Sequence, residues 1–354
     1  MFTRTPGGRR AALVLVAASA AGLALATSPA SAATPTWEPL TVPTTNARVS
    51  LLPFDGQNAY ARTMDHCTGE CTYAPKLWQR TGTTWKQVTM PADVQAGALA
   101  GTGPTDLWVF GSKNTTTGSY RFNHYDGTTW TSNLNPDPRN AEALDAQAAG
   151  RNSVWAVGNY RGTGTNWYPM VTHWNGSGWN TTKFTGIQGQ LDAVDVNSET
   201  DVWASGYREV SGRFQGLVLH YDGTRWAEVA VPRVSGEDTM LREVISNGPD
   251  DVWVASGSRV SHWDGTAWTR RDTPAAVSSF AYYGGQVYAG LSGAPKLVRW
   301  TGARWEAAGS LVKGEMVDQL STTPDGTLYA ASSEGGDLSE FHAYLARLAA
   351  PTAG

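Results

Sequence analysis

Short apolar runs recur along the chain, each five or six residues long and often followed by a glycine. Runs of this length, rich in Val, Ala, Trp and Tyr, are typical of strands buried on both faces. Their sevenfold recurrence predicts seven equivalent second strands. Clear copies contain residues 106–109, 153–156, 201–204 and 251–254, and weaker copies contain 58–61, 286–289 and 327–330.

A tryptophan also recurs near the end of seven similar segments, at intervals of 37 to 49 residues. This spacing is typical of a four-stranded propeller blade rather than of a helical repeat. Seven such segments predict seven blades. The recurring residues are Trp37, Trp85, Trp130, Trp179, Trp226, Trp268 and Trp305.

An aromatic residue followed by Asp-Gly or Asn-Gly precedes several of these tryptophans. Such a dipeptide between two aromatic-rich runs is a strong hairpin signal, because a type I′ turn requires positive φ at both central residues. We therefore expect a type I′ turn between the third and fourth strands of each blade. Clear copies lie at 124–127, 173–176, 220–223 and 262–265, and degenerate copies lie at 78–82 and 300–302.

The two ends of the chain each carry part of one blade. Residues 36–43 resemble residues 84–91, a fourth strand, but no other three strands precede them. Residues 316–322, 327–332 and 341–348 supply three strands that no fourth strand follows. We therefore predict an all-β fold, a seven-bladed β-propeller of four-stranded blades whose last blade is closed by the N-terminal strand.

Residues 1–32 have the composition of a secretory signal peptide. Three arginines precede an apolar run over 11–26, and Ala-Ser-Ala at 30–32 is a small-residue cleavage site. We therefore expect residues 33–354 to form a single propeller domain that is secreted. The arginine pair at 9 and 10 leaves the twin-arginine export route open as an alternative to the general one.

Charge and hydropathy exclude some classes of partner. Removal of residues 1–32, which contain three Arg and no acidic residue, changes the formal charge from −4 to −7. An acidic chain without a basic patch among its aromatics argues against a nucleic-acid partner. No later stretch approaches the roughly eighteen apolar residues of a membrane span. We also expect the protein to be a monomer.

Together these motifs resemble a known family. A second-strand phrase ending in Gly, an aromatic-Asp-Gly turn and a Trp five residues after the aromatic are similar to the repeats of bacterial kelch-like propellers. The compact segment 241–272 is similar to tectonin-type lectin repeats. However, one glycine stands where kelch repeats carry two, and the Asp-Gly-x-x-Trp turn differs from the sialidase Asp-box. The resemblance therefore implies a scaffold and leaves the function open.

Most tryptophans and histidines occupy repeated positions. Fifteen of the 16 Trp do so, and we expect them to pack between blades because large aromatic rings dominate core burial. We expect the repeated histidines to form hydrogen bonds between blades rather than to bind a ligand. Trp167 is the tryptophan outside the repeat. The repeated histidines are His124, His173, His220 and His262.

Non-repeated residues gather in the loops between second and third strands, especially in blades three and four. In a propeller these loops share one face with the links between blades. Aromatic rings beside arginines suit a polar ligand such as a sugar, because the rings stack on it and Arg donates hydrogen bonds. The alternative is that the rings pack their own loops. The candidate ligand-binding residues are Arg161, Trp167, Tyr168, Tyr207, Arg208, Arg213 and Phe214.

A second group of candidates lies at the predicted mouth of the central channel, ten or eleven residues before the second-strand aromatic. Asp192, Arg242 and Asp318 share one spacing, and Asp145 joins them through a one-residue slip. Carboxylates that converge in this way are candidate ligands for Ca²⁺ or another hard cation. The alternative is that each Asp caps the turn that enters its strand.

The two cysteines, Cys67 and Cys71, lie close together in the loop of blade one. After export to an oxidising compartment we expect a local disulfide, which shapes the loop more than it stabilises the fold. A zinc site that also uses His66 is the alternative.

Catalysis is the alternative to binding. A propeller lyase or hydrolase needs acid and base groups in one cavity, and the candidates are His66 and Glu70 of blade one with His342 of blade seven. No motif places these residues within reach of one substrate. We therefore expect a secreted, non-catalytic recognition module that binds a carbohydrate or a cell-envelope polymer on one face. A protein-interaction scaffold is a further alternative.

Overall fold

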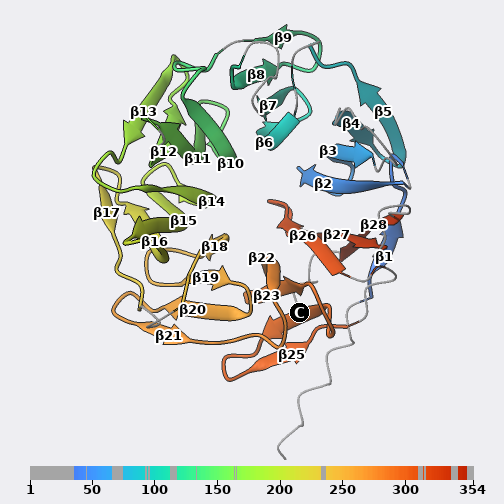
Figure 1. Ribbon diagram of the computed structural model, residues 1–354. Helices are drawn as coiled ribbons and strands as arrows, with labels where there is room; N and C mark the ends of the chain where they lie inside the picture. The colour runs from blue at the N-terminus through green and yellow to red at the C-terminus, as the bar shows by residue number, and fades with distance from the viewer. Residues whose placement is uncertain are drawn as a thin grey trace, which may run out of the picture. The chain divides into compact units, whose positions relative to one another are not determined.

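The computed structural model describes residues 36–348, apart from 45, 66–74, 92–93, 95, 112–117, 133, 163, 165, 233–236, 310–313, 315 and 336–341. In this part of the chain every regular element is a β-strand, and the strands form seven four-stranded antiparallel sheets. The sheets are arranged as a ring of blades (Figure 1). The compact unit that contains them spans Pro35–Gly354. The predicted all-β, seven-bladed propeller is therefore confirmed.

The blades follow the chain in order, with the first strand of each nearest the central axis (Figure 1). Blade one comprises β2 (Ala47–Pro53), β3 (Asn58–Asp65), β4 (Lys76–Thr81) and β5 (Thr84–Val88). Blade two comprises β6 (Ala96–Gly103), β7 (Asp106–Gly111), β8 (Arg121–Tyr125) and β9 (Trp130–Thr131). Blade three comprises β10 (Ala141–Gly150), β11 (Ser153–Arg161), β12 (Trp167–Trp174) and β13 (Trp179–Lys183).

The remaining blades have the same order. Blade four comprises β14 (Gly189–Ser198), β15 (Asp201–Val210), β16 (Arg213–Tyr221) and β17 (Trp226–Glu228). Blade five comprises β18 (Glu243–Ser246), β19 (Val252–Ser256), β20 (Arg259–Trp263) and β21 (Trp268–Arg270). Blade six comprises β22 (Val277–Tyr283), β23 (Gln286–Leu291), β24 (Leu297–Trp300) and β25 (Trp305–Ala307). Blade seven comprises β26 (Met316–Thr322), β27 (Leu328–Glu334), β28 (His342–Leu348) and β1 (Glu38–Leu40).

The apolar core lies between neighbouring blades. All six residues of β7 are buried, and Trp108 and Phe110 of this strand pack with Val154 of blade three. In the same way, Trp155 of blade three packs with Val202 of blade four. Burial of apolar area between sheets therefore holds the ring together.

The N-terminal strand closes the last blade, as predicted. β1 pairs antiparallel with β28, with Glu38 opposite Arg347, and the Nε atom of Arg347 donates to the Glu38 carboxylate over 2.9 Å. Across this closure the Trp85 indole donates to the carbonyl of Thr41. Trp130 forms the equivalent bond between blades two and one. The closing strand therefore makes the contacts that a continuous blade makes.

The hairpins at the Asp-Gly motifs differ from the predicted type I′ turn. Four residues, 126–129, separate β8 from β9, and Gly127 has a φ of 94°. Ser211 is the one non-glycine residue with positive φ in the described chain, so the Asp of the motif does not adopt it. Instead the Asp126 carboxylate accepts hydrogen bonds from the amides of Thr128 and Thr129. The motif thus encodes a side-chain-capped four-residue loop.

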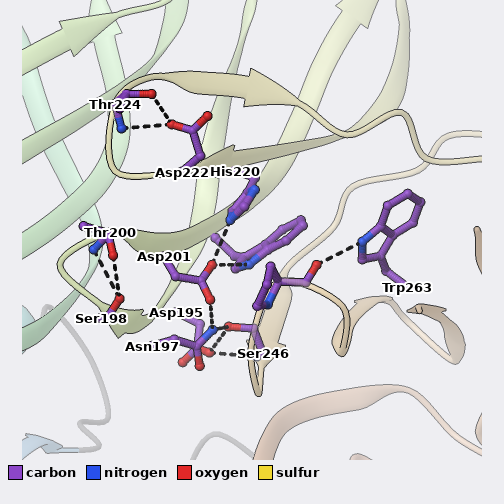
Figure 2. A network of polar contacts seen from close by, with 12 residues as sticks. Asp195, Asn197, Ser198, Thr200, Asp201, His220, Asp222, Thr224, Ser246 and Trp263 are labelled. Carbon is purple, nitrogen blue, oxygen red and sulfur yellow. Dashed lines mark hydrogen bonds and ion pairs between the residues drawn. The ribbon is translucent and has the colours of Figure 1, made fainter. Parts of the chain in front are cut away.

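The repeated histidines bond within their own blade, which corrects the prediction of bonds between blades. His220 Nε2 lies 2.8 Å from Asp201 Oδ1 of the adjacent strand in blade four, and Figure 2 shows this contact. His124 with Asp106 and His262 with Asp251 repeat the pair in blades two and five. The carboxylate ahead of the second strand is the nearer partner because antiparallel pairing places it beside the histidine.

Candidate functional site

The innermost strands of all seven blades line one large cavity, the central channel, with a volume of about 1310 Å³. The four predicted mouth residues Asp145, Asp192, Arg242 and Asp318 all line this cavity. The contacts of each residue show that they do not act as one ring.

A β-bulge near the start of the innermost strand sets the position of these side chains. The register of β14 against β15 skips one residue at Asp192. The same skip occurs at Asp318 in β26 and at Leu144 in β10. The structure therefore places Leu144, not Asp145, at the position equivalent to Asp192. The one-residue slip that the prediction assumed for blade three does not occur.

A glycine opposite the bulge makes this backbone approach possible. A Cβ atom at Gly206 would lie 2.1 Å from the carbonyl oxygen of Gln190, and one at Gly158 would lie 2.0 Å from that of Glu142. A side chain cannot be accommodated at such distances. The bulge is thus the physical reason for a glycine three residues after Trp155 and Trp203.

Asp145 caps the neighbouring blade instead of a turn in its own blade. Its Oδ2 atom accepts a hydrogen bond of 2.9 Å from the amide of Val194, on the innermost strand of blade four. Burial raises the pKa of Asp145 to about 6, although this amide acts in the opposite direction. The carboxyl therefore joins two blades at the channel wall.

Sequence reasoning missed the other side chains that join innermost strands, because they differ in type from blade to blade. Each accepts a backbone amide of the next blade, so the free strand edge that faces the channel is satisfied. Gln147 accepts from Val196, Asp195 from Ser246, Ser279 from Leu320 and Gln319 from Leu51. The only signal in the sequence was a polar residue at alternating positions in a buried strand.

Asp192, Arg242 and Tyr207 form a polar cluster where blades four and five meet. Asp192 Oδ1 accepts from Gln190 over 2.6 Å and from Arg242 over 3.4 Å. The Asp192 side chain is 8% exposed, whereas that of Arg242 is 55% exposed. Burial raises the pKa of Tyr207, and the Asp192 carboxylate raises it further. Tyr207, which the sequence assigned to the loop patch, therefore lies close to the channel-mouth residues Asp192 and Arg242.

Asp318 belongs to β26 of blade seven. Blade seven is not a neighbour of blades four and five in the ring (Figure 1). Burial raises its pKa, whereas a hydrogen bond with Ser333 and the charge of Arg48 lower it. Among the described residues no three His, Cys, Asp or Glu side chains gather closely enough to hold a metal ion. The predicted acidic ring for Ca²⁺ therefore has no support in the geometry.

The loop patch of blade three centres on Trp167 and Arg161, which lie opposite each other across β12 and β11. The Arg161 guanidinium lies 5.8 Å from the centroid of the Trp167 ring. Trp167 is half-buried and belongs to no apolar cluster of the described core. Tyr168 pairs with Tyr160 instead, on the other face of the sheet.

The candidates of blade four are also divided between two faces. Tyr207 contacts Phe214 edge to face, with ring centroids 4.8 Å apart. Arg208 points the other way and forms an ion pair of 2.5 Å with Glu228 on the outer strand. Arg213 is exposed near the tip of the hairpin. On the rim that the ends of these hairpins form, neighbouring candidates within each blade therefore lie on opposite faces of their sheet.

This rim is built by unusually long hairpins. β15 has ten residues, whereas β19 in blade five has five. The extra length carries Tyr207 and the residues that follow it beyond the level of blade five. The strand lengths therefore make the rim higher at blade four than at blade five.

Several other candidates lie outside the described residues, namely His66, Glu70, Cys67 and Cys71. The disulfide, the zinc site and the acid–base pair of blade one are therefore not described. His342 is exposed at the start of β28, opposite Glu334. The described residues include no helix of the length and hydrophobicity that a membrane span requires.

Similarity to known proteins is a similarity of fold. The structure of YCF48 bound to D1 peptide matches with a TM-score of 0.60 and 16% identity, covering 89% of this chain and 95% of that one. YCF48 from Cyanidioschyzon merolae matches with a TM-score of 0.57 and 14% identity over 88% and 98% of the chains. The propeller domain of the Trilobed protease from Pyrococcus furiosus matches with a TM-score of 0.57 and 10% identity over 86% and 94%.

Comparisons of sequence give no further assignment. No protein-family model matches the chain. No curated protein matches it either. At identities of 10 to 16% the structural matches establish the propeller fold alone.

Proposed function

We propose that the protein is an exported recognition module that binds a carbohydrate or a cell-envelope polymer through the rim of blades three and four. The fold supports a binding role, since propellers present loops from several blades on one face around a channel. The composition of the rim supports a polar ligand, because aromatic rings and arginine side chains lie at the ends of its long hairpins.

The observation that carries this proposal is the pairing of Trp167 with Arg161. Trp167 makes no aromatic ring contact with another described residue. The other tryptophans occupy repeated positions, and examples such as Trp108 and Trp253 pack between blades. A half-buried indole offers a flat apolar face to the C–H groups of a sugar ring. A guanidinium beside it donates several hydrogen bonds to hydroxyl or carboxylate oxygens. This is the chemistry of a carbohydrate subsite.

A glycan array probed with the full chain tests the proposal. We expect Trp167→Ala to weaken binding at least about tenfold, since removal of a stacking platform costs on the order of 1.4 kcal/mol or more. Val210→Ala serves as the matched control, because Val210 is a 39% exposed apolar residue on the β15–β16 hairpin. Binding that survives Trp167→Ala unchanged removes this patch from the proposal.

A protein-interaction scaffold is the second candidate. It is favoured by one finding, that a structurally similar propeller, YCF48, was solved with a bound peptide. The wide polar channel mouth is compatible with an extended peptide. A peptide array probed with the same variants separates the two candidates. Peptide binding without glycan binding, lost in Trp167→Ala, would favour the scaffold.

A further inference from the structure

Besides Glu142, which accepts a hydrogen bond from Asn159, blades three to five place four carboxyl groups on one side of the central channel. Asp145, Asp192, Asp195 and Glu243 come from the innermost strands of three consecutive blades, and all four line the cavity. Arg62, a cation on the wall of blade one, donates to backbone carbonyls. The four carboxyl groups of Asp145, Asp192, Asp195 and Glu243 together form the acidic wall of the channel.

Two members of the acidic wall have structural partners and two retain unused acceptors. Asp145 and Asp195 accept backbone amides of the next blade over 2.9 Å and 2.7 Å. Glu243 accepts no hydrogen bond from any described residue. Asp192 is nine-tenths buried, yet its Oδ2 atom has no hydrogen-bond partner in the described chain. A buried carboxylate oxygen without a donor, such as Asp192 Oδ2, is unfavourable, and a ligand with N–H groups would satisfy it. Glu243 is partly buried and can bind the same ligand.

We propose that the acidic wall binds an organic cation, a protonated primary amine that enters the channel between blades three and five. An ammonium carries three donors, so one such group can contact oxygens of more than one strand. A metal ion is a poorer fit, because no three acidic side chains here gather around one point. A cavity of about 1310 Å³ accommodates the chain that carries the cationic group.

The electrostatics of the wall agree with this assignment. Burial raises the pKa of Glu243 well above its usual value, and the nearby Asp145 raises it further. Burial also raises the pKa values of Asp192 and Asp195. Arg242 lies beside the wall, but it already pairs with Asp192 Oδ1. A bound cation would stabilise the ionised carboxylates, so binding at a pH below these raised pKa values should release protons.

Isothermal titration calorimetry on the full chain tests this site separately from the rim. The probes are spermidine and a glycine-flanked pentapeptide with one lysine, acetylated at its N-terminus and amidated at its C-terminus, and the matching capped norleucine peptide is the uncharged control. We expect micromolar to millimolar binding of at least one cationic probe, none of the norleucine peptide, and proton release in buffers of different ionisation enthalpy. Binding of spermidine alone indicates a free polyamine, and binding of the peptide alone indicates a lysine side chain.

Glu243→Gln is the decisive variant, because no described hydrogen bond depends on this carboxyl. We expect a thermal melt equal to or above that of the wild type, with cation affinity reduced at least about tenfold. Trp167→Ala should leave cation binding unchanged, and Glu243→Gln should leave glycan binding unchanged. Equal cation affinity in Glu243→Gln and wild type, or no binding of either cationic probe, overturns the proposal.

Discussion

His220 Nε2 lies 2.8 Å from Asp201 Oδ1, and its imidazole stacks on Trp203 with ring centroids 4.1 Å apart. The same Oδ1 atom accepts the indole N–H of Trp203, and Oδ2 accepts the side-chain amide of Asn197. Asn197 also donates to Ser246 of blade five (Figure 2). One carboxylate therefore connects the inner three strands of blade four and, through Asn197, the next blade.

Removal of this carboxylate should destabilise the propeller. We expect Asp201→Ala to lower the free energy of unfolding by roughly 2–4 kcal/mol, because it leaves several part-buried donors without an acceptor. Urea unfolding measures the change. Asp222→Ala, in the exposed hairpin of the same blade, is the control and should have a clearly smaller effect. Equal effects of the two variants would contradict this role for Asp201.

The closing strand should contribute more stability than its three residues suggest. Trp37 is 5% exposed and packs with residues of blades six and seven. We expect Trp37→Ala to cost about 3–5 kcal/mol, as other large-to-small core substitutions do, and deletion of residues 33–43 to lower the melting temperature sharply. Differential scanning calorimetry measures both. A deletion that melts like the wild type would show that β1 does not close the ring.

Gly206 should not tolerate even a methyl group. A Cβ atom there would lie 2.1 Å from the Gln190 carbonyl oxygen, so the bulge that positions Asp192 would have to shift. We expect Gly206→Ala to destabilise the protein by roughly 1–3 kcal/mol. Gly186→Ala is the matched control, since that position faces open space. Similar melting temperatures for the two variants would contradict the explanation of the repeated glycine.

Asp145 should make stability depend on pH. Its pKa of about 6 in the folded protein exceeds the ordinary value of 3.8, so the folded state binds the proton more tightly. Its contribution is therefore most favourable below about pH 4 and is lost as pH rises through 6. Asp145→Asn keeps an acceptor for the Val194 amide and removes the charge. We expect it to raise stability by roughly 1–3 kcal/mol at pH 8 and by little at pH 4.

Chemical denaturation of both proteins at the two pH values measures this difference. Glu243→Gln should show a pH dependence of the same sign, because burial raises that pKa as well. A stability difference between Asp145→Asn and wild type that does not change with pH would contradict the assignment of the raised pKa to Asp145.

The candidate site was predicted less completely than the fold. Trp167 was identified by its place outside the repeat, and in the structure it is half-buried and belongs to no apolar cluster of the described core. The pairing of Arg208 with Glu228 could not be foreseen, because it depends on which sheet face each residue occupies. Adjacent residues of a strand point to opposite faces, so proximity in a loop sequence does not imply one surface.

The amino-acid sequence alone was sufficient for the number of blades, the strand order and the closure of the ring. These features follow from a repeat of about 45 residues whose apolar strands and turns recur in register. It could not show that Asp192 lies in a bulge, that Asp145 bonds to blade four, or that no described residue donates a hydrogen bond to Glu243. Those contacts join residues of different blades, and their geometry depends on the packing of whole sheets, which local patterns do not encode.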